Sequence, residues 1–360
     1  MTSGPLGRAR ELARRGLGSC APNPRVGAVA LEDGHVVGEG WHRGYGLPHA
    51  EEDALAAAAS AGHPRPDEIR VSLEPCSTVG KRPACTALLE EAGVARVLCG
   101  ALDPNPAHGG AGLEWLTAAG IHATVAEGSI DLAEDNAAFL RFLSLGRPWV
   151  ILKWACDEDG HVAGASRRWV TGSEARQRVH DLRGSCEAVL VGSGTVRADD
   201  PRLDARGGHV LEGPPLRVVL DSSWSTPADA AWLREGEGDR LVVGCDPQEP
   251  ERRRALASSG ASSEIAGPGP HVDLETAFGL LWERGVRRAL VEAGPRLGRA
   301  LLEAGLVDQV EVHVSPDLLK GRLVMGPLGA TSSDPAGALG LVDVYGREAG
   351  ADAVRGGFLP

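Results

Sequence analysis

Three potential metal ligands, His49, Cys76 and Cys85, constrain the fold more than any other feature of this sequence, because one ion can use all three only if distant segments converge. One histidine and two cysteines fill three positions of a tetrahedral zinc ion. The fourth position is left for water, whose pKa zinc lowers from about 16 toward 7. Glu51 stands two residues after His49 and offers a carboxylate for proton transfer. The sequence therefore predicts a hydrolytic zinc site.

Helix-forming stretches follow two of these ligands. Residues 52–59 and 86–92 are rich in Ala, Leu and acidic residues, so we expect His49 and Cys85 to open helices, where the helix dipole favours a thiolate. In zinc nucleobase deaminases the glutamate at the position of Glu51 binds no metal and moves protons, which favours deamination. Eight residues separate Cys76 from Cys85, against two in many such enzymes, which predicts a long substrate loop. A disulfide or two buried thiols are the alternatives.

Length and composition restrict the remaining possibilities. A chain of 360 residues favours two domains, and no apolar run approaches the roughly 20 residues of a membrane span. Seven cysteines, an odd number spread along the chain, do not suggest a disulfide framework, and the N-terminus lacks a signal-peptide pattern. A net charge of −12 with 4% aromatic residues disfavours nucleic-acid binding. We expect a cytoplasmic protein with a small-molecule substrate and no membrane or nucleic-acid partner.

The first part of the chain alternates strands and helices, which predicts an α/β/α sandwich. An Asp-Gly pair at 33–34 predicts a hairpin between its first two strands. The expected strands are 25–31, 36–41, 69–73, 94–100 and 121–125, and the expected helices follow His49 and Cys85 and cover 113–119 and 131–144.

A junction at 146–148 divides the chain into predicted domains 1–146 and 147–360. The second is also α/β, with strands expected at 149–155, 188–192, 216–221, 241–244, 289–292 and 309–314, helices at 173–182 and 274–283, and loops at 207–214 and 258–270. Lys153, Thr195 and Glu292 fall in or after strands, where α/β ligand sites form. The Gly-rich turns at 192–195 and 294–298 are candidate phosphate cradles, although each could be only a tight turn.

Motifs across both halves resemble the bifunctional riboflavin-biosynthesis deaminase/reductase family. The matching stretches are Pro22-Asn23-Pro24-Arg25-Val26-Gly27, Gly40-Trp41-His42, His49-Ala50-Glu51, Leu73-Glu74-Pro75-Cys76-Ser77, Asp103-Pro104-Asn105-Pro106, Trp169-Val170-Thr171-Gly172, Val191-Gly192-Ser193-Gly194-Thr195-Val196 and Asp199-Asp200-Pro201-Arg202-Leu203. The resemblance implies a cytidine-deaminase-like domain followed by a dihydrofolate-reductase-like domain. It also implies zinc-dependent loss of an amino group from a diaminopyrimidinone ribosylamine phosphate, then NADPH reduction of the ribosyl group to ribityl.

The same resemblance assigns roles to individual residues. In the deaminase half, His49, Cys76 and Cys85 would bind Zn²⁺, Glu51 would be the proton shuttle, and Asn23, His42 and Lys81 would contact the substrate. In the reductase half, Lys153 would be catalytic, and Ser166, Arg183, Leu203, Arg206 and Glu292 would hold the ribose phosphate substrate. The NADPH contacts would be Trp169, Thr195, Asp199, Ser222, Gly294, Pro295, Arg296, Leu297, Gly298, Arg299 and Ala300. We also expect a homo-oligomer.

Departures from the family pattern leave two alternatives to this function. The family usually has histidine at Thr78, Thr-Pro-Pro at 82–84 and Gly-Gly at 293–294, and the loop at 161–168 looks shortened. None of these changes alters a predicted zinc ligand or Glu51. The alternatives are a paralogue acting on a related pyrimidine and a non-catalytic binding or regulatory protein.

Overall fold

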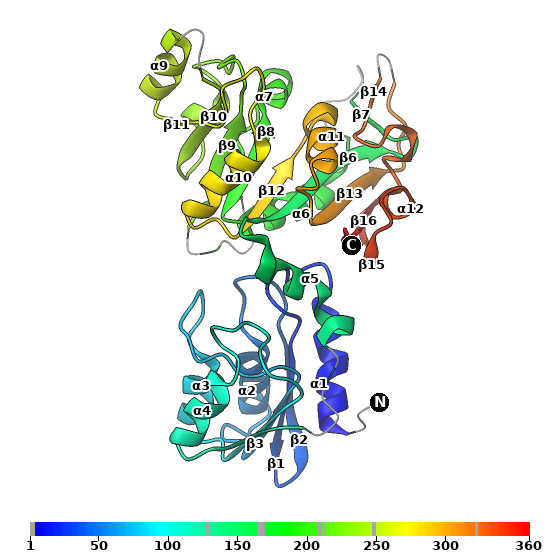
Figure 1. Ribbon diagram of the computed structural model, residues 1–360. Helices are drawn as coiled ribbons and strands as arrows, with labels where there is room; N and C mark the ends of the chain where they lie inside the picture. The colour runs from blue at the N-terminus through cyan, green and yellow to red at the C-terminus, as the bar shows by residue number, and fades with distance from the viewer. Residues whose placement is uncertain are drawn as a thin grey trace. The chain divides into compact units, whose positions relative to one another are not determined.

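The protein consists of two compact units, Met1–Ser144 and Leu145–Pro360 (Figure 1). They are seen in a computed structural model that describes residues 4–126, 130, 132–163, 170–206, 211, 213–246, 250–320 and 323–360. None of the helices within these ranges combines the length and hydrophobicity that a membrane crossing requires.

The N-terminal unit is built on a five-stranded mixed sheet with the order β2-β1-β3-β4-β5. Its strands are β1 (Gly27–Glu32), β2 (His35–Trp41), β3 (Glu68–Val71), β4 (Arg96–Cys99) and β5 (His122–Val125), and its helices are α1 (Pro5–Ala13), α2 (Ala50–Ser60), α3 (Cys85–Glu91), α4 (Ala111–Ala118) and α5 (Leu132–Leu145). Strand β1 is antiparallel to β2 and β3, whereas β3, β4 and β5 are parallel.

Helices cover both faces of this sheet, which confirms the predicted α/β/α sandwich. Ala9 and Leu12 of α1 pack with Val29 and Leu31 of β1, while alternate β1 residues pack with α2, α3 and α4 on the opposite face. The predicted hairpin turn is also confirmed, because Asp33 and Gly34 both have positive φ, as a two-residue type I′ turn requires.

Close packing of α2 against β2 fixes the position of the first predicted zinc ligand. Three of the buried residues of α2 are alanines, Ala50, Ala54 and Ala58. A Cβ atom on Gly40 of β2 would lie 2.3 Å from the backbone nitrogen of Ala54, so the helix reaches this distance only because both partners are small. The helix start, and with it His49, is thereby held against the sheet.

The C-terminal unit is built on a nine-stranded sheet with the order β11-β10-β9-β8-β12-β6-β13-β16-β15. Its strands are β6 (Trp149–Asp157), β8 (Ala188–Gly192), β9 (Leu216–Leu220), β10 (Arg240–Gly244), β11 (Ser262–Ile265), β12 (Arg288–Glu292), β13 (Gln309–Ser315), β15 (Val342–Ala349) and β16 (Asp352–Phe358); β7 (His161–Ala163) and β14 (Val324–Met325) form a separate pair. Its helices are α6 (Ser173–Gly184), α7 (Ser193–Asp199), α8 (Ala231–Arg234), α9 (Pro250–Ser258), α10 (Leu274–Glu283), α11 (Pro295–Glu303) and α12 (Pro335–Leu339). In this sheet order, every strand from β11 through β13 is parallel to its neighbours in that run. Strands β16 and β15 then add an antiparallel edge beside β13.

The six strands and two helices predicted for this unit are present, but the loop predicted at 258–270 is partly wrong. Strand β11 (Ser262–Ile265) lies within it as a sheet edge, and its polar, partly exposed residues give no apolar run for a sequence to reveal. Of the other predicted loop, 207–210 and 212 lie outside the described residues. The main core packs Ala277, Phe278 and Leu281 of α10 and Leu301 of α11 against one face of the parallel sheet.

Candidate active sites

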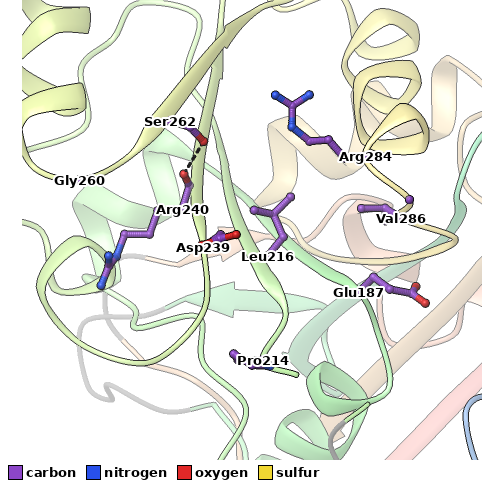
Figure 2. A pocket seen from close by; sticks show the side chains of 10 residues that line it. Glu187, Pro214, Leu216, Asp239, Arg240, Gly260, Ser262, Arg284 and Val286 are labelled. Carbon is purple, nitrogen blue, oxygen red and sulfur yellow. Dashed lines mark hydrogen bonds between the residues drawn. The ribbon is translucent and has the colours of Figure 1, made fainter. Parts of the chain in front are cut away.

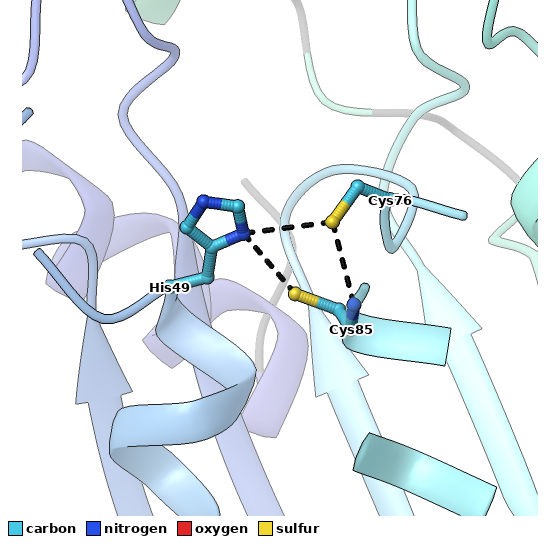
Figure 3. Close-up of side chains that lie close together, drawn as sticks. All are labelled: His49, Cys76 and Cys85. Atoms are coloured by element: carbon cyan, nitrogen blue, oxygen red, sulfur yellow. Dashed lines mark hydrogen bonds between the residues drawn. The ribbon is translucent and has the colours of Figure 1, made fainter. Parts of the chain in front are cut away.

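The three predicted zinc ligands converge in the N-terminal unit (Figure 3). His49 is the N-cap of α2, Cys85 is the first residue of α3, and Cys76 lies in the segment that follows β3. One ligand atom from each residue lies within 4.8 Å of the other two. The Nδ1 atom of His49 is 3.2 Å from the sulfur of Cys85 and 3.6 Å from that of Cys76. Both predicted helix starts are therefore confirmed.

The donor set fits zinc, and the disulfide alternative is excluded because all seven cysteines are free. A hydrogen bond from Cys85 and the nearby His49 hold the pKa of Cys76 well below that of an ordinary thiol, while the same contact with Cys76, together with burial, raises the pKa of Cys85. The backbone N–H of Cys85 also donates to the sulfur of Cys76 at 3.4 Å. The pair thus favours one thiolate even without a cation, and a zinc ion would favour both.

Glu51 lies in the first turn of α2 and is 3% exposed. Burial, followed by the negative charge of Cys76, raises the pKa of Glu51 to about 7. A carboxyl group with a pKa near neutrality can both take and return a proton at physiological pH. The environment of Glu51 is therefore suited to general acid/base catalysis beside the three ligands.

Two of the three predicted substrate contacts adjoin this cluster. The rings of His42 and His49 are 5.3 Å apart, edge to face, and His42 Nδ1 lies 3.0 Å from the carbonyl oxygen of Pro48. Because a carbonyl can only accept, Nδ1 carries the proton, and Nε2 accepts from the side-chain amide of Asn23 at 3.2 Å. The third, Lys81, lies on the long loop between the two cysteines, with its ammonium 5.5 Å from the ring centre of Tyr45.

Glu74 also supports this site, a role that the sequence did not predict. It is buried two residues before Cys76, and its carboxylate accepts four backbone N–H groups, from Asp103 (3.0 Å), Gly110 (2.9 Å), Gly112 (2.8 Å) and Leu113 (3.3 Å). These groups belong to the start of α4 and the segment before it. The only sequence signal is an acid between an apolar strand and a Pro-Cys pair.

In the C-terminal unit, Lys153, Glu292 and Arg183 come together. Lys153 of β6 is in register with Glu292 at the end of β12, and Arg183 of α6 donates to both carboxylate oxygens of Glu292 at 2.5 and 2.9 Å. Burial lowers the pKa of Lys153, and the charge of Glu292 opposes this effect. Burial alone would raise the pKa of Glu292, but the charge and hydrogen bonds of Arg183 hold it at about 2. Arg183 also donates to the carbonyl of Asp204 at 3.0 Å.

The remaining predicted substrate residues are more scattered. The side chain of Leu203 is fully buried and its φ is +60°, so any contact it makes with a ligand would be through its backbone. Arg206 is about half exposed and pairs with Asp204 at 3.2 Å. Ser166 and the cofactor residue Trp169 lie outside the described residues.

The two Gly-rich turns lie side by side at the carboxyl ends of β8 and β12. A Cβ on Gly294 would be 3.5 Å from the hydroxyl of Thr195, and one on Gly192 would be 3.6 Å from Leu297. Gly294 is the N-cap of α11, so residues 294–300 open a helix as predicted. Asp199 ends α7, and Ser222 follows β9 and accepts the N–H of Val272 at 3.1 Å. A dinucleotide pyrophosphate suits such a helix start.

A cavity of about 630 Å³ lies at the opposite edge of the same sheet (Figure 2). Leu216, Arg240 and Ser262 in its wall are the first residues of β9, β10 and β11, whereas Thr195, Glu292 and Gly294 lie at or beyond the carboxyl ends of β8 and β12. None of the predicted site residues that the structure describes lines this cavity. It is therefore separate from these predicted sites.

Comparisons with known proteins agree with this division of the chain. Residues 6–101 match the family described as the cytidine and deoxycytidylate deaminase zinc-binding region, and residues 148–339 match the RibD C-terminal domain. The riboflavin biosynthesis protein RibD of Aquifex aeolicus is 35% identical over 90% of this chain and 89% of its own length.

Solved structures give the same result over almost the whole chain. RibD of Acinetobacter baumannii is 34% identical with a TM-score of 0.68, covering 99% of this chain and 98% of its own. A diaminohydroxyphosphoribosylaminopyrimidine deaminase/5-amino-6-(5-phosphoribosylamino)uracil reductase of Thermotoga maritima is 30% identical with a TM-score of 0.65, covering 99% and 97%. The predicted cytidine-deaminase-like and dihydrofolate-reductase-like folds are confirmed. The chain therefore belongs to the RibD family and is a bifunctional deaminase and reductase of riboflavin biosynthesis that uses zinc and NADPH.

Proposed function

We propose that the N-terminal unit deaminates 2,5-diamino-6-ribosylamino-4(3H)-pyrimidinone 5′-phosphate, with His49, Cys76 and Cys85 holding zinc. The observation that carries this proposal is the convergence of three ligand atoms beside the buried carboxyl group of Glu51. Zinc, when bound, supplies Lewis-acid activation of water. Glu51 takes a proton from the attacking water and delivers it to the amino group, which leaves as ammonia.

The surrounding polar residues would orient the pyrimidine. His42 is held in one tautomer by Pro48 and receives the Asn23 amide, so both side chains are fixed beside His49. Lys81, on the loop between the cysteines, would supply a positive charge toward the phosphorylated sugar. Prior fixing of these groups lowers the entropy lost when the substrate binds.

In the C-terminal unit, Lys153 and Glu292 would orient the ribosyl group of 5-amino-6-(5-phosphoribosylamino)uracil for reduction. When bound, NADPH would supply the hydride that the sugar C1′ needs as the C1′–O4′ bond opens and O4′ gains a proton. The ammonium of Lys153 would donate toward the sugar oxygen. Arg183, already bound to both oxygens of Glu292, would act mainly by fixing that carboxylate.

The other reductase residues would bind either NADPH or the phosphorylated substrate. Thr195, Asp199, Ser222 and residues 294–300, with Trp169, would hold NADPH, because the adjacent turns offer a helix start to its pyrophosphate. Arg206, Leu203 and Ser166 would hold the substrate, with Arg206 suited to its phosphate. We further propose that 1–146 and 147–360 are the two catalytic domains, and that the protein is a cytoplasmic homo-oligomer without a nucleic-acid partner.

The test is a coupled assay on zinc-loaded protein that follows ammonia release and then NADPH oxidation. Glu51→Gln should keep zinc but lower deamination by roughly 10²- to 10⁴-fold through loss of general acid/base catalysis. Lys153→Ala should impair reduction alone. Glu91→Gln and Lys320→Ala, which alter exposed side chains, are matched controls. Unchanged deamination in Glu51→Gln, or parallel loss of both steps in Lys153→Ala, would overturn these roles.

A further inference from the structure

Lys153 lies in a row of buried charges that extends across three neighbouring strands. It is in register with Glu292 of β12 on one side and with Glu311 of β13 on the other. In-register residues of parallel neighbours point to the same face of a sheet. Lys153 therefore shares one face of the sheet with a glutamate from each neighbouring strand, and only Glu292 of the two was expected from the sequence.

Helix α6 supplies an arginine to each of these carboxylates. Arg183 pairs with Glu292 at 2.5 and 2.9 Å, and Arg178 pairs with Glu311 at 3.3 and 3.2 Å, again through two nitrogens and two oxygens. The Glu311 side chain is fully buried, whereas that of Arg178 is 25% exposed. The row thus reads Arg183, Glu292, Lys153, Glu311, Arg178, with alternating charge.

Glu311 has further donors that fix its carboxylate. His313 Nε2 lies 3.0 Å from one oxygen, and the hydroxyl of Tyr345 donates to the other at 3.4 Å. Gln309 in turn donates to the hydroxyl of Tyr345 at 2.8 Å. His313 is fully buried, and its Nδ1 has no hydrogen-bond partner among the described residues.

Such a cluster is costly to bury, because a carboxylate and an imidazole are removed from water in the middle of a sheet. Apolar side chains of similar size would often be as stable or more so. A polar network in the interior of a sheet, where apolar side chains are usual, indicates a functional requirement beside it. The group beside it is Lys153.

We propose that Glu311, fixed by Arg178 and His313, is a positioning residue that holds the ammonium of Lys153 in place for the reduction. This inference rests on the proposed role of Lys153. Burial lowers the pKa of Lys153, and the negative charges of Glu292 and Glu311 both oppose this effect. With Glu311 removed, Lys153 is attracted toward Glu292 alone and loses one of the two negative charges that favour its protonated form.

The charged and titratable groups with the largest influence on Lys153 come from its own strand, from both neighbouring strands and from α6. They are Glu292 of β12, Glu311 and His313 of β13, Arg183 of α6, and Cys156 of its own strand. Glu292 and Glu311 favour its protonation, whereas Arg183 and burial oppose it. Neutralising Glu311 must therefore lower the pH at which Lys153 loses its proton.

The experiment compares Glu311→Gln with the wild type in the zinc-loaded, full-length protein. The kcat of reduction should fall roughly 10- to 100-fold, as expected for a misplaced catalytic group. The alkaline limb of its pH profile should move to lower pH, while the dissociation constant for NADPH and the deamination rate stay unchanged. Glu348→Gln makes the same charge change on an exposed residue of β15 and should alter none of these values.

Further variants keep the proposal falsifiable. If Glu311→Gln loses NADPH binding, the same measurements are made on Arg178→Gln. This variant removes a partly exposed side chain and should also lower the kcat of reduction. Unchanged kcat with an unmoved pH profile, in whichever variant binds NADPH, overturns the proposal. Lys153→Ala is measured in parallel: if it retains reduction, the proposed function of Lys153 fails, whereas loss only in Lys153→Ala refutes the role of Glu311 alone.

Discussion

Replacing Glu74 by glutamine tests whether this buried carboxylate holds the zinc site together. One oxygen of Glu74 accepts the N–H groups of Asp103 and Gly110, and the other accepts those of Gly112 and Leu113. A glutamine side chain has the same shape but keeps only one acceptor oxygen. Its amide nitrogen would face two N–H donors, and no rotation of the side chain avoids this.

The magnitude follows from those contacts. Two buried N–H groups left without an acceptor cost about 1–3 kcal/mol each, so the N-terminal unit should lose about 2–6 kcal/mol. For a unit of this size, each kcal/mol lowers the unfolding midpoint by about 2–4 °C, which gives a fall on the order of 10 °C. Because Cys76 lies two residues after Glu74, zinc should be released in the same transition.

The assay is thermal unfolding of the zinc-loaded protein in the presence of a chromogenic chelator. Zinc release reports on the N-terminal unit alone, which avoids assigning a single midpoint to a chain with two units. Glu114→Gln is the matched control, because it makes the same change at an exposed position in the first turn of α4. If Glu74→Gln and Glu114→Gln release zinc at the same temperature, the four N–H contacts do not stabilise the site and the reasoning is refuted.

Two other predictions concern the packing of α4 and the charge of Glu292. Gly112→Ala should lower the zinc-release midpoint, although alanine normally favours a helix, because the new Cβ would lie 2.1 Å from the carbonyl oxygen of Pro75; a higher midpoint would contradict this close approach. The pKa of Glu292 is lowered to about 2, so its contribution to folding is present above its ordinary pKa and is lost as pH falls toward 2. Acid unfolding of the reductase unit is monitored through the loss of NADPH binding. The free energy of unfolding should fall less steeply with decreasing pH over this interval in Glu292→Gln than in the wild type. Equal slopes would contradict the lowered pKa of Glu292.

The zinc cluster could be predicted from the sequence because its signals are local. His49 and Glu51 are two residues apart, and the Ala-rich segments after His49 and Cys85 show where both helices begin. Strands β2 and β3, which precede His49 and Cys76, are both antiparallel to β1 between them, so they run in the same direction and bring these ligands to one edge of the sheet. The Asp-Gly hairpin and the buried strand β8 were predictable for the same reason, since turn chemistry and a continuous apolar run are visible within a few residues.

The surroundings of Lys153 could not be predicted, because they depend on pairs far apart in the chain. Arg183 and Glu292 are separated by 109 residues, and Arg178 and Glu311 by 133. A sequence shows the charges but not which strand becomes the neighbour of β6. Strands β15 and β16 were also missed, because their glycines and charged residues give no apolar alternation at this antiparallel edge.

The altered loop between the two cysteines shows how a departure from the family pattern can leave the metal site intact. Arg82, where the family tends to have threonine, forms an ion pair with Glu52 of α2, which ties the loop to the helix that His49 caps. Both side chains are partly exposed, so the pair contributes at most about 1 kcal/mol to stability. Its main effect is to restrict the loop, in which Lys81 immediately precedes Arg82. The substitution therefore bears on the substrate contact proposed for Lys81, whereas ligand geometry is set independently by the starts of α2 and α3.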